Sequence, residues 1–176
     1  MIKIGDKVFT PFIGRQTIEE RISALATQIS QDYHQKCPLL VAVLNGSFMF
    51  ASDLMKSISI PCEITFIKVA SYKQLTSTGQ IQELIGLKEA ITGRHIIVIE
   101  DIVDTGLTMH HIIDNIQQQK PQSLEIATLL FKPEALKKDI QPRYVGFEIA
   151  NRFVVGFGLD YNGLGRNLSE LYVLAD

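Results

Sequence analysis

Residues 96–108 are Ile96-Ile97-Val98-Ile99-Glu100-Asp101-Ile102-Val103-Asp104-Thr105-Gly106-Leu107-Thr108, an apolar run followed by an acidic turn. A short continuous apolar run is typical of a strand buried on both faces of a parallel sheet. Two adjacent carboxylates, Glu100 and Asp101, end the run, and Asp104 follows. Beyond the turn, apolar residues recur at helical spacing at Met109, Ile112, Ile113 and Ile116. The stretch therefore predicts a strand, a turn and a helix, which together form the repeating unit of an α/β fold.

The same alternation of strand and helix signals extends along the rest of the chain. The capping-box pattern Thr17-Ile18-Glu19-Glu20 predicts the start of a helix, and a second helix is predicted over Phe48–Ser57. Further strands are predicted at Leu39–Leu44, Cys62–Val69, Leu124–Phe131, Val145–Ile149 and Phe153–Gly156. Strands that alternate with helices predict an α/β domain with a mostly parallel central sheet flanked by helices.

Length and composition indicate one globular domain. A chain of 176 residues fits a single domain, and 46% hydrophobic with 20% charged residues is ordinary globular usage. No Pro/Ser-rich linker, low-complexity tract or internal repeat divides the sequence. We therefore expect residues 1–176 to form a single domain.

Composition also argues against several classes of protein. The longest apolar runs, such as Leu39–Leu44, are too short to span a bilayer, and the N-terminus has no apolar segment of a secretory signal. Cys37 and Cys62 form no CxxC pair. The formal net charge is −2 with scattered Lys and Arg, whereas proteins that bind nucleic acid usually carry a basic face. We expect a cytoplasmic protein that binds neither membranes nor nucleic acid.

The acidic turn suits a phosphorylated sugar as ligand. Amides at a helix N-terminus, with Gly106 allowing close backbone approach and threonine hydroxyls adding donors, form an anion pocket. Three carboxylates beside such a pocket would repel a phosphate ester unless something neutralises them. A sugar phosphate resolves this conflict if Glu100 and Asp101 hold the ribose hydroxyls, directly or through Mg²⁺ and its waters. The alternative interpretation is that the acids only cap the helix and complement its dipole.

Two segments resemble motifs of a known family. Val98–Thr108 is similar to the phosphoribosyl-pyrophosphate signature of type I phosphoribosyltransferases, and more narrowly to that of the hypoxanthine–guanine branch. Leu44–Phe50 resembles the family's pyrophosphate-binding loop, which would make Asn45 and Gly46 substrate-binding residues. The resemblance implies a type I phosphoribosyltransferase fold, in which a small hood carries the base site.

The resemblance also implies where the base and a closing loop lie. Ser71 and Tyr72 match the start of the family's flexible catalytic loop, which would close over the pyrophosphate. Lys132 matches the lysine that donates to the 6-oxo group of the purine. Phe153 matches the aromatic residue that stacks on the base, and the Val154 backbone would read the base edge.

Each part of the signature receives a role from the same resemblance. Asp104 would be the catalytic residue that accepts or stabilises the N7 proton of the purine. Glu100 and Asp101 would bind the ribose and, with Asp160, the metal, and Arg166 would contact pyrophosphate. The residues expected to bind the 5-phosphate are Thr105, Gly106, Leu107 and Thr108.

Two residues depart from the commoner family pattern. Asn45 and Leu107 stand where many relatives carry a basic residue, in the pyrophosphate loop and in the signature respectively. Both changes remove a cation from the phosphate region. We therefore expect greater reliance on Mg²⁺, Arg166 and backbone amides for charge neutralisation.

The activity implied is purine salvage by a Mg²⁺-dependent hypoxanthine phosphoribosyltransferase, a pentosyltransferase. It would join phosphoribosyl pyrophosphate to hypoxanthine, and to guanine, giving IMP or GMP and pyrophosphate. Two alternatives stay open: a regulator that keeps the fold to sense nucleotides and bind RNA, and an enzyme for xanthine, adenine or a pyrimidine. The family is usually dimeric or tetrameric, so a homodimer or homotetramer is expected.

Overall fold

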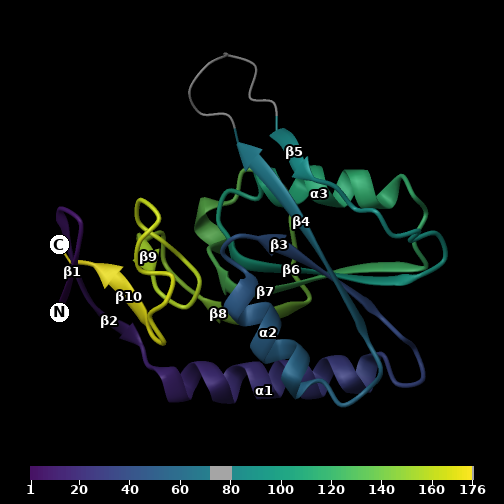
Figure 1. The fold of residues 1–176 in the computed structure, drawn as a ribbon, viewed down its shortest axis with the longest axis horizontal. Coiled ribbons are helices and arrows are strands. Elements are labelled where there is room, and N and C mark those ends of the chain that lie inside the picture. Colours follow the sequence, from purple (N-terminus) through teal and green to yellow (C-terminus); the bar gives the residue numbers. More distant parts are fainter. Residues whose placement is uncertain (72–80, 176) are drawn as a thin grey trace.

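The computed structural model describes residues 1–71 and 81–175, without the side chains of residues 70, 71 and 81–84. In this part of the chain a six-stranded sheet has the order β5-β4-β3-β6-β7-β8 (Figure 1). β5 is antiparallel to its neighbour, and the other strands of the sheet are parallel. The strands are β3 (Leu39–Leu44), β4 (Glu63–Ser71), β5 (Ile81–Ile85), β6 (His95–Val103), β7 (Ser123–Phe131) and β8 (Tyr144–Glu148).

Helices cover both faces of this sheet. Residues such as Leu40 and Ile97 point into a core shared with α1 (Arg15–Asp32) and α2 (Phe48–Ser57). Their neighbours Leu39 and Ile96 point the other way, into a core shared with α3 (Leu107–Gln117). Alternate residues of one strand thus face two apolar layers, which explains why these strands are continuous apolar runs. The predicted α/β fold is confirmed.

The first helix begins earlier than predicted, and the capping-box prediction was wrong. α1 starts at Arg15 after Gly14, and no side chain caps it. The glutamates expected in the box bond along the helix instead: Arg15 donates to Glu19 over 2.6 Å, and Gln16 donates to Glu20 over 2.9 Å. These pairs, one turn apart, support helical geometry upstream of Thr17. Among the described residues, no helix is long and apolar enough to cross a membrane.

A second, four-stranded sheet forms a small hood beside the main sheet. Its order is β1-β2-β10-β9, and every pairing in it is antiparallel. It combines the two ends of the chain, which lie together at one side of the molecule (Figure 1). The strands are β1 (Ile2–Ile4), β2 (Lys7–Ile13), β9 (Val154–Val155) and β10 (Leu171–Leu174).

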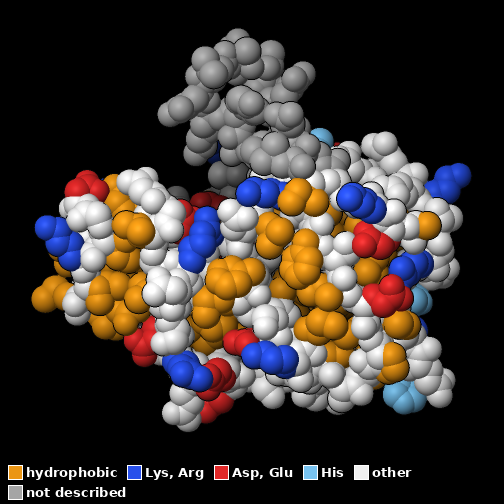
Figure 2. Space-filling view, in the orientation of Figure 1, with side chains coloured by type: hydrophobic (Ala, Val, Ile, Leu, Met, Phe, Trp, Pro, Cys, Tyr) orange, Lys and Arg blue, Asp and Glu red, His pale blue; other side chains and the backbone are white. Residues whose placement is uncertain are grey.

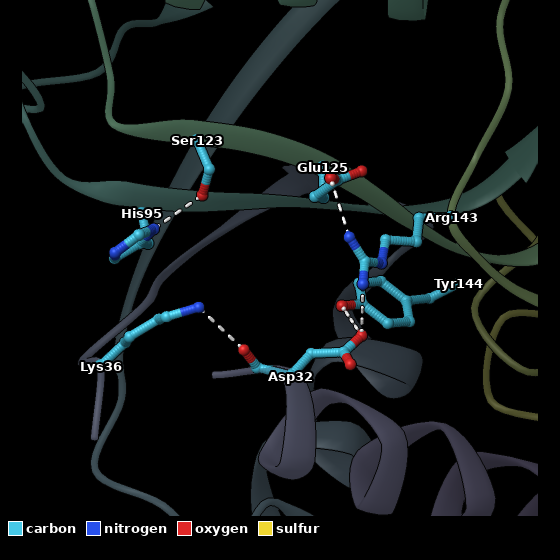
Figure 3. A network of polar contacts seen from close by, with 7 residues as sticks. All are labelled: Asp32, Lys36, His95, Ser123, Glu125, Arg143 and Tyr144. Atoms are coloured by element: carbon cyan, nitrogen blue, oxygen red, sulfur yellow. Dashed lines mark hydrogen bonds and ion pairs between the residues drawn. The ribbon is translucent and has the colours of Figure 1, made fainter. Parts of the chain in front are cut away.

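A polar network ties the last turn of α1 to the amino ends of the main strands (Figure 3). Asp32 accepts hydrogen bonds from Arg143 over 2.9 Å and from the Tyr144 hydroxyl over 2.8 Å. Arg143 also donates to Glu125 over 3.3 Å. Burial raises the pKa of Tyr144, so its hydroxyl remains a donor. The carboxyl ends of the strands lie at the opposite edge, where sheets of this kind bind their ligands.

Candidate active site

Three turns meet at the carboxyl ends of neighbouring strands. Residues 45–47 follow β3, residues 104–106 follow β6, and Lys132 follows β7. β6 pairs with both β3 and β7. The structure therefore brings these three segments together at one rim of the sheet.

Glu100, which is buried, and Asp101, which is half-buried, form an acidic pair near the end of β6, and the strand continues past them to Val103. Glu100 is only 9% exposed. The Asp101 amide bonds the Glu100 carboxylate over 3.2 Å, and the Ile102 amide bonds the Asp101 carboxylate over 2.9 Å. Burial raises the pKa of Glu100 well above its usual value, and the neighbouring Asp101 charge raises it further. Burial also raises the pKa of Asp101.

Glu100→Gln is expected to stabilise the metal-free protein at neutral and alkaline pH. A carboxyl whose pKa is higher in the folded state costs stability as pH rises above its unfolded pKa, because the unfolded chain loses its proton first. Glutamine removes that cost. We expect Tm in EDTA to exceed the parent's by several degrees at pH 8, since each kcal/mol shifts Tm by about 2–4 °C at this size.

The same comparison contains its own control. At pH 4 the two proteins should converge, because Glu100 is then protonated in the folded state and about two-thirds protonated in the unfolded chain. Glu20→Gln, which alters an exposed side chain on α1, should leave Tm within about 1 °C at both values, a typical surface effect. If Glu100→Gln raised Tm by the same amount at pH 4 and pH 8, the charge on Glu100 would not be the cause of the difference in stability.

The turn after β6 encloses a small cavity of about 80 Å³. Gly106 has a φ of +75°, and a Cβ there would approach Ile140 and Leu136 at 3.2 Å, so glycine permits both the turn and its packing. The amides at the start of α3 are donors that the helix itself does not use. Leu107 is 45% exposed at this edge. The lining residues are Glu100, Ile102, Val103, Asp104, Thr105, Gly106, Thr108 and Met109.

A second cavity of about 220 Å³ lies beside the first, between the main sheet and the hood. Lys132 is 6% exposed and donates through Nζ to Asp104 Oδ2 over 3.1 Å. Phe153 is 45% exposed, and its ring centroid lies 6.2 Å from that of Phe9 and 5.9 Å from that of Tyr161. The lining residues are Asp101, Ile102, Asp104, Lys132, Phe153, Val154, Leu159 and Asp160.

Asp160 lies in an ion pair with Arg166. Arg166 contacts Asp160 Oδ1 over 2.6 Å and donates to the Gly158 carbonyl over 2.6 Å. The Gly163 amide bonds the other Asp160 oxygen over 2.6 Å. Both oxygens of Asp160 are therefore already engaged within the protein.

The acidic side chains fit a metal ion that is shared with substrate. Within the described ranges, no group of three or more His, Cys, Asp or Glu side chains is arranged to hold a metal. Glu100 and Asp101 nevertheless place two carboxylates side by side, one buried and one half-buried. Mg²⁺ is commonly held by one or two carboxylates together with substrate phosphates and waters, and this pair suits that arrangement.

The loop after β3 packs tightly against both the acids and the hood. A Cβ at Gly46 would collide with the Asp101 carboxylate, and a Cβ at Gly158 would collide with the Gly46 carbonyl. The Leu44–Asn45 peptide bond is cis, and Asn45 is exposed. The strand ladder pairs Leu44 with Lys68, which places a lysine on β4 beside the start of this loop.

The sequence reasoning missed several residues of the site, and one predicted segment is not described. Ile102 and Leu159 line the second cavity, and Phe9 and Tyr161 pack against Phe153. Ile102 follows Asp101 in the chain, and Leu159 and Tyr161 flank Asp160, so these three adjoin predicted site residues, whereas Phe9 carries no local signal. Tyr72 lies outside the described residues, as does the Ser71 side chain.

Comparison with known proteins identifies the family. The phosphoribosyl transferase domain model matches residues 14–162. This chain belongs to the phosphoribosyltransferase family. The enzyme is 44% identical over 160 residues to the hypoxanthine-guanine phosphoribosyltransferase of Staphylococcus aureus strain Mu50, covering 90% of this chain and 89% of that one. It is 38% identical over 160 residues to the hypoxanthine-guanine-xanthine phosphoribosyltransferase of Tritrichomonas foetus, with 90% and 87% covered.

A solved structure agrees with this assignment to the phosphoribosyltransferases. A hypoxanthine-guanine phosphoribosyltransferase from Bacillus anthracis superposes with a TM-score of 0.90 at 37% identity, covering 97% of this chain and 99% of that one. The predicted type I phosphoribosyltransferase fold is thus confirmed, and the enzyme is a transferase.

Proposed function

We propose that this enzyme transfers the 5-phosphoribosyl group from phosphoribosyl pyrophosphate to hypoxanthine, and to guanine, in purine salvage. IMP or GMP and pyrophosphate would be the products, residues 1–176 would act as one domain, and the reaction would take place in the cytoplasm. The observation that carries the proposal is the Lys132–Asp104 pair, held at 3.1 Å in the cavity that Phe153 lines.

This pair is complementary to one edge of a 6-oxopurine. The 6-oxo group accepts a hydrogen bond, and the neighbouring N7 carries a proton to be removed. Lys132 presents donors only, and ionised Asp104 presents acceptors only. The Phe153 ring would stack on the base, and the Val154 backbone would read the far edge. Relatives named for hypoxanthine, guanine and xanthine support 6-oxopurines as the substrate class. The order of preference among these three bases is a question for experiment.

In the proposed reaction N9 of the base forms a bond to C1 of the sugar while the bond from C1 to pyrophosphate breaks. Asp104 takes the N7 proton, and residues 105–108 hold the 5-phosphate. Glu100 and Asp101 orient the ribose hydroxyls and would hold Mg²⁺, with Asp160 beside them. When bound, Mg²⁺ supplies positive charge that stabilises the departing pyrophosphate. Asn45, Gly46 and Arg166 would contact that leaving group.

We also propose that the enzyme is a homodimer or homotetramer. Figure 2 shows hydrophobic side chains at the surface over the region of α2 and β4. Phe48 on α2 is 43% exposed and Phe66 on β4 is 42% exposed. Exposed apolar surface of this kind commonly marks a protein interface.

The proposed function is tested by mixing the enzyme with phosphoribosyl pyrophosphate, Mg²⁺ and one base at a time. Hypoxanthine, guanine, xanthine, adenine and uracil form the panel, and the nucleotide formed is separated by chromatography. We expect IMP and GMP, with no comparable product from adenine or uracil. An RNA-binding regulator would instead form no nucleotide and be retained on an RNA column at moderate salt.

Lys132→Gln is expected to weaken purine selection. A buried donor left opposite the 6-amino group of adenine costs about 1–3 kcal/mol, and more when it is charged. Glutamine presents either an acceptor or a donor, so it tolerates both bases. We expect kcat/KM for hypoxanthine to fall and the ratio of hypoxanthine to adenine to fall by at least about tenfold. Lys56→Gln, which changes a lysine whose side chain is 70% exposed on α2, is the control.

If the ratio of kcat/KM for hypoxanthine to that for adenine were the same in Lys132→Gln as in the parent, Lys132 would not select the base. Phe153 and Val154 would then have to select the base alone.

A further inference from the structure

Lys132 leaves β7 between the ends of its two neighbouring strands. Its amide donates to the Val103 carbonyl of β6 over 3.0 Å. On the other side, the Ile149 amide after β8 donates to the Phe131 carbonyl over 2.8 Å. The chain past β8 then reaches Asn151, so Lys132 has Asp104 on one side and Asn151 on the other.

Both neighbours accept from the lysine ammonium. Nζ lies 3.1 Å from Asp104 Oδ2 and 3.5 Å from Asn151 Oδ1. An ammonium group has three donors and no acceptor. Within the described part of the chain these two oxygens are its side-chain acceptors, which leaves the third donor for a ligand. The two acceptors differ in one respect: Asp104 can gain a proton, and the Asn151 amide stays neutral.

This difference matters during the proposed reaction. Hydrogen bonds to an ionised acceptor are roughly twice as strong as bonds between neutral groups. When Asp104 takes the N7 proton it loses its charge, and its hold on Lys132 weakens at the moment when the 6-oxo group needs that donor. The bond to Asn151 does not depend on the protonation of Asp104.

We propose that Asn151 is a positioning residue that holds Lys132 against the 6-oxo group while Asp104 engages N7. The proposal rests on the proposed function and deepens it, because it assigns part of base selection to a residue beyond the signature and the base-binding motifs. Asn151 is exposed, so its truncation opens no cavity in the core.

The test is a double-mutant cycle on kcat/KM for hypoxanthine and for adenine, with Asn151→Ala, Lys132→Gln and the double variant. Asn151→Ala should lower kcat/KM for hypoxanthine by roughly threefold to tenfold, within the range for the net contribution of one ordinary hydrogen bond, because the contact of 3.5 Å is long. The ratio of hypoxanthine to adenine should fall with it, and KM for phosphoribosyl pyrophosphate should not change. In the Lys132→Gln background the same truncation should have an effect below about twofold, because coupled residues are not additive.

Two further variants separate positioning from a general structural effect. Asn151→Asp keeps an oxygen acceptor at the same place and, because an ionised acceptor bonds the ammonium more strongly, should retain a preference for hypoxanthine over adenine at least equal to the parent's. Asn115→Ala truncates an exposed asparagine on α3 that bonds His111, and it should leave kcat/KM unchanged for both bases.

The role of Asn151 would be overturned if Asn151→Ala left the ratio of hypoxanthine to adenine unchanged, or if it lowered kcat/KM equally in the presence and absence of Lys132. The proposed function would still hold in either case, provided that the parent enzyme forms nucleotide. A parent enzyme that forms no nucleotide would overturn both.

Discussion

Asp104→Asn should lower kcat by about 10²–10⁴-fold, the range that general acid–base catalysis contributes. Asparagine keeps the shape of the turn and an oxygen facing Lys132, but it cannot take the N7 proton. KM for phosphoribosyl pyrophosphate should change by less than about threefold, because the phosphate donors and the acidic pair stay in place. Steady-state kinetics with hypoxanthine at saturating phosphoribosyl pyrophosphate measure both quantities.

Asp139→Asn is a suitable control for this substitution. Asp139 is exposed and lines neither of the two cavities of the site, so kcat should equal the parent's. If Asp104→Asn retained a near-normal kcat, Asp104 would serve only to hold Lys132 through the bond of 3.1 Å.

Removal of divalent metal should abolish activity. Glu100 is buried and the adjacent Asp101 is half-buried, and pyrophosphate would bring further negative charge beside them. Asn45 and Leu107 supply no cation at the positions where the family resemblance would place one. Activity in excess EDTA should fall below about 1% and return with Mg²⁺ or Mn²⁺, since a bound metal contributes several kcal/mol of charge stabilisation.

Activity that survives metal removal would change the roles assigned to the acidic side chains. Undiminished turnover after thorough chelation would mean that Glu100, Asp101 and Asp160 do not act through a metal. Their place in the account would then be limited to ribose binding.

The acidic turn could be predicted from sequence because its parts are contiguous. Glu100 and Asp101 lie near the end of β6, and Asp104 and Gly106 lie in the turn between β6 and α3, so local patterns fix their relative positions. The shared rim of β3, β6 and β7 lies at the carboxyl ends of parallel strands, which is where α/β sheets generally bind their ligands.

The hood could not be predicted in detail, because it depends on contacts between distant parts of the chain. β2 pairs with β10, so Phe9 reaches Phe153 only when both ends of the chain come together. Short antiparallel strands have weak sequence signals, and packing decides their register.

Side-chain pairing was likewise beyond the reach of pattern analysis. The sequence placed Lys132 and Asp104 in separate roles, whereas the structure joins them at 3.1 Å. Asp160 and Arg166 were also considered separately and form an ion pair. Such pairs depend on where side chains point after folding.

The central claim is that the Lys132–Asp104 pair recognises a 6-oxopurine. Its most direct test is the ratio of kcat/KM for hypoxanthine to that for adenine in the unmodified enzyme, at saturating phosphoribosyl pyrophosphate and Mg²⁺. Sites built around one hydrogen bond reject analogues that lack it by about 10⁴-fold, so we expect a ratio of at least about 10³. Comparable values for the two bases, or a preference for adenine, would contradict the account.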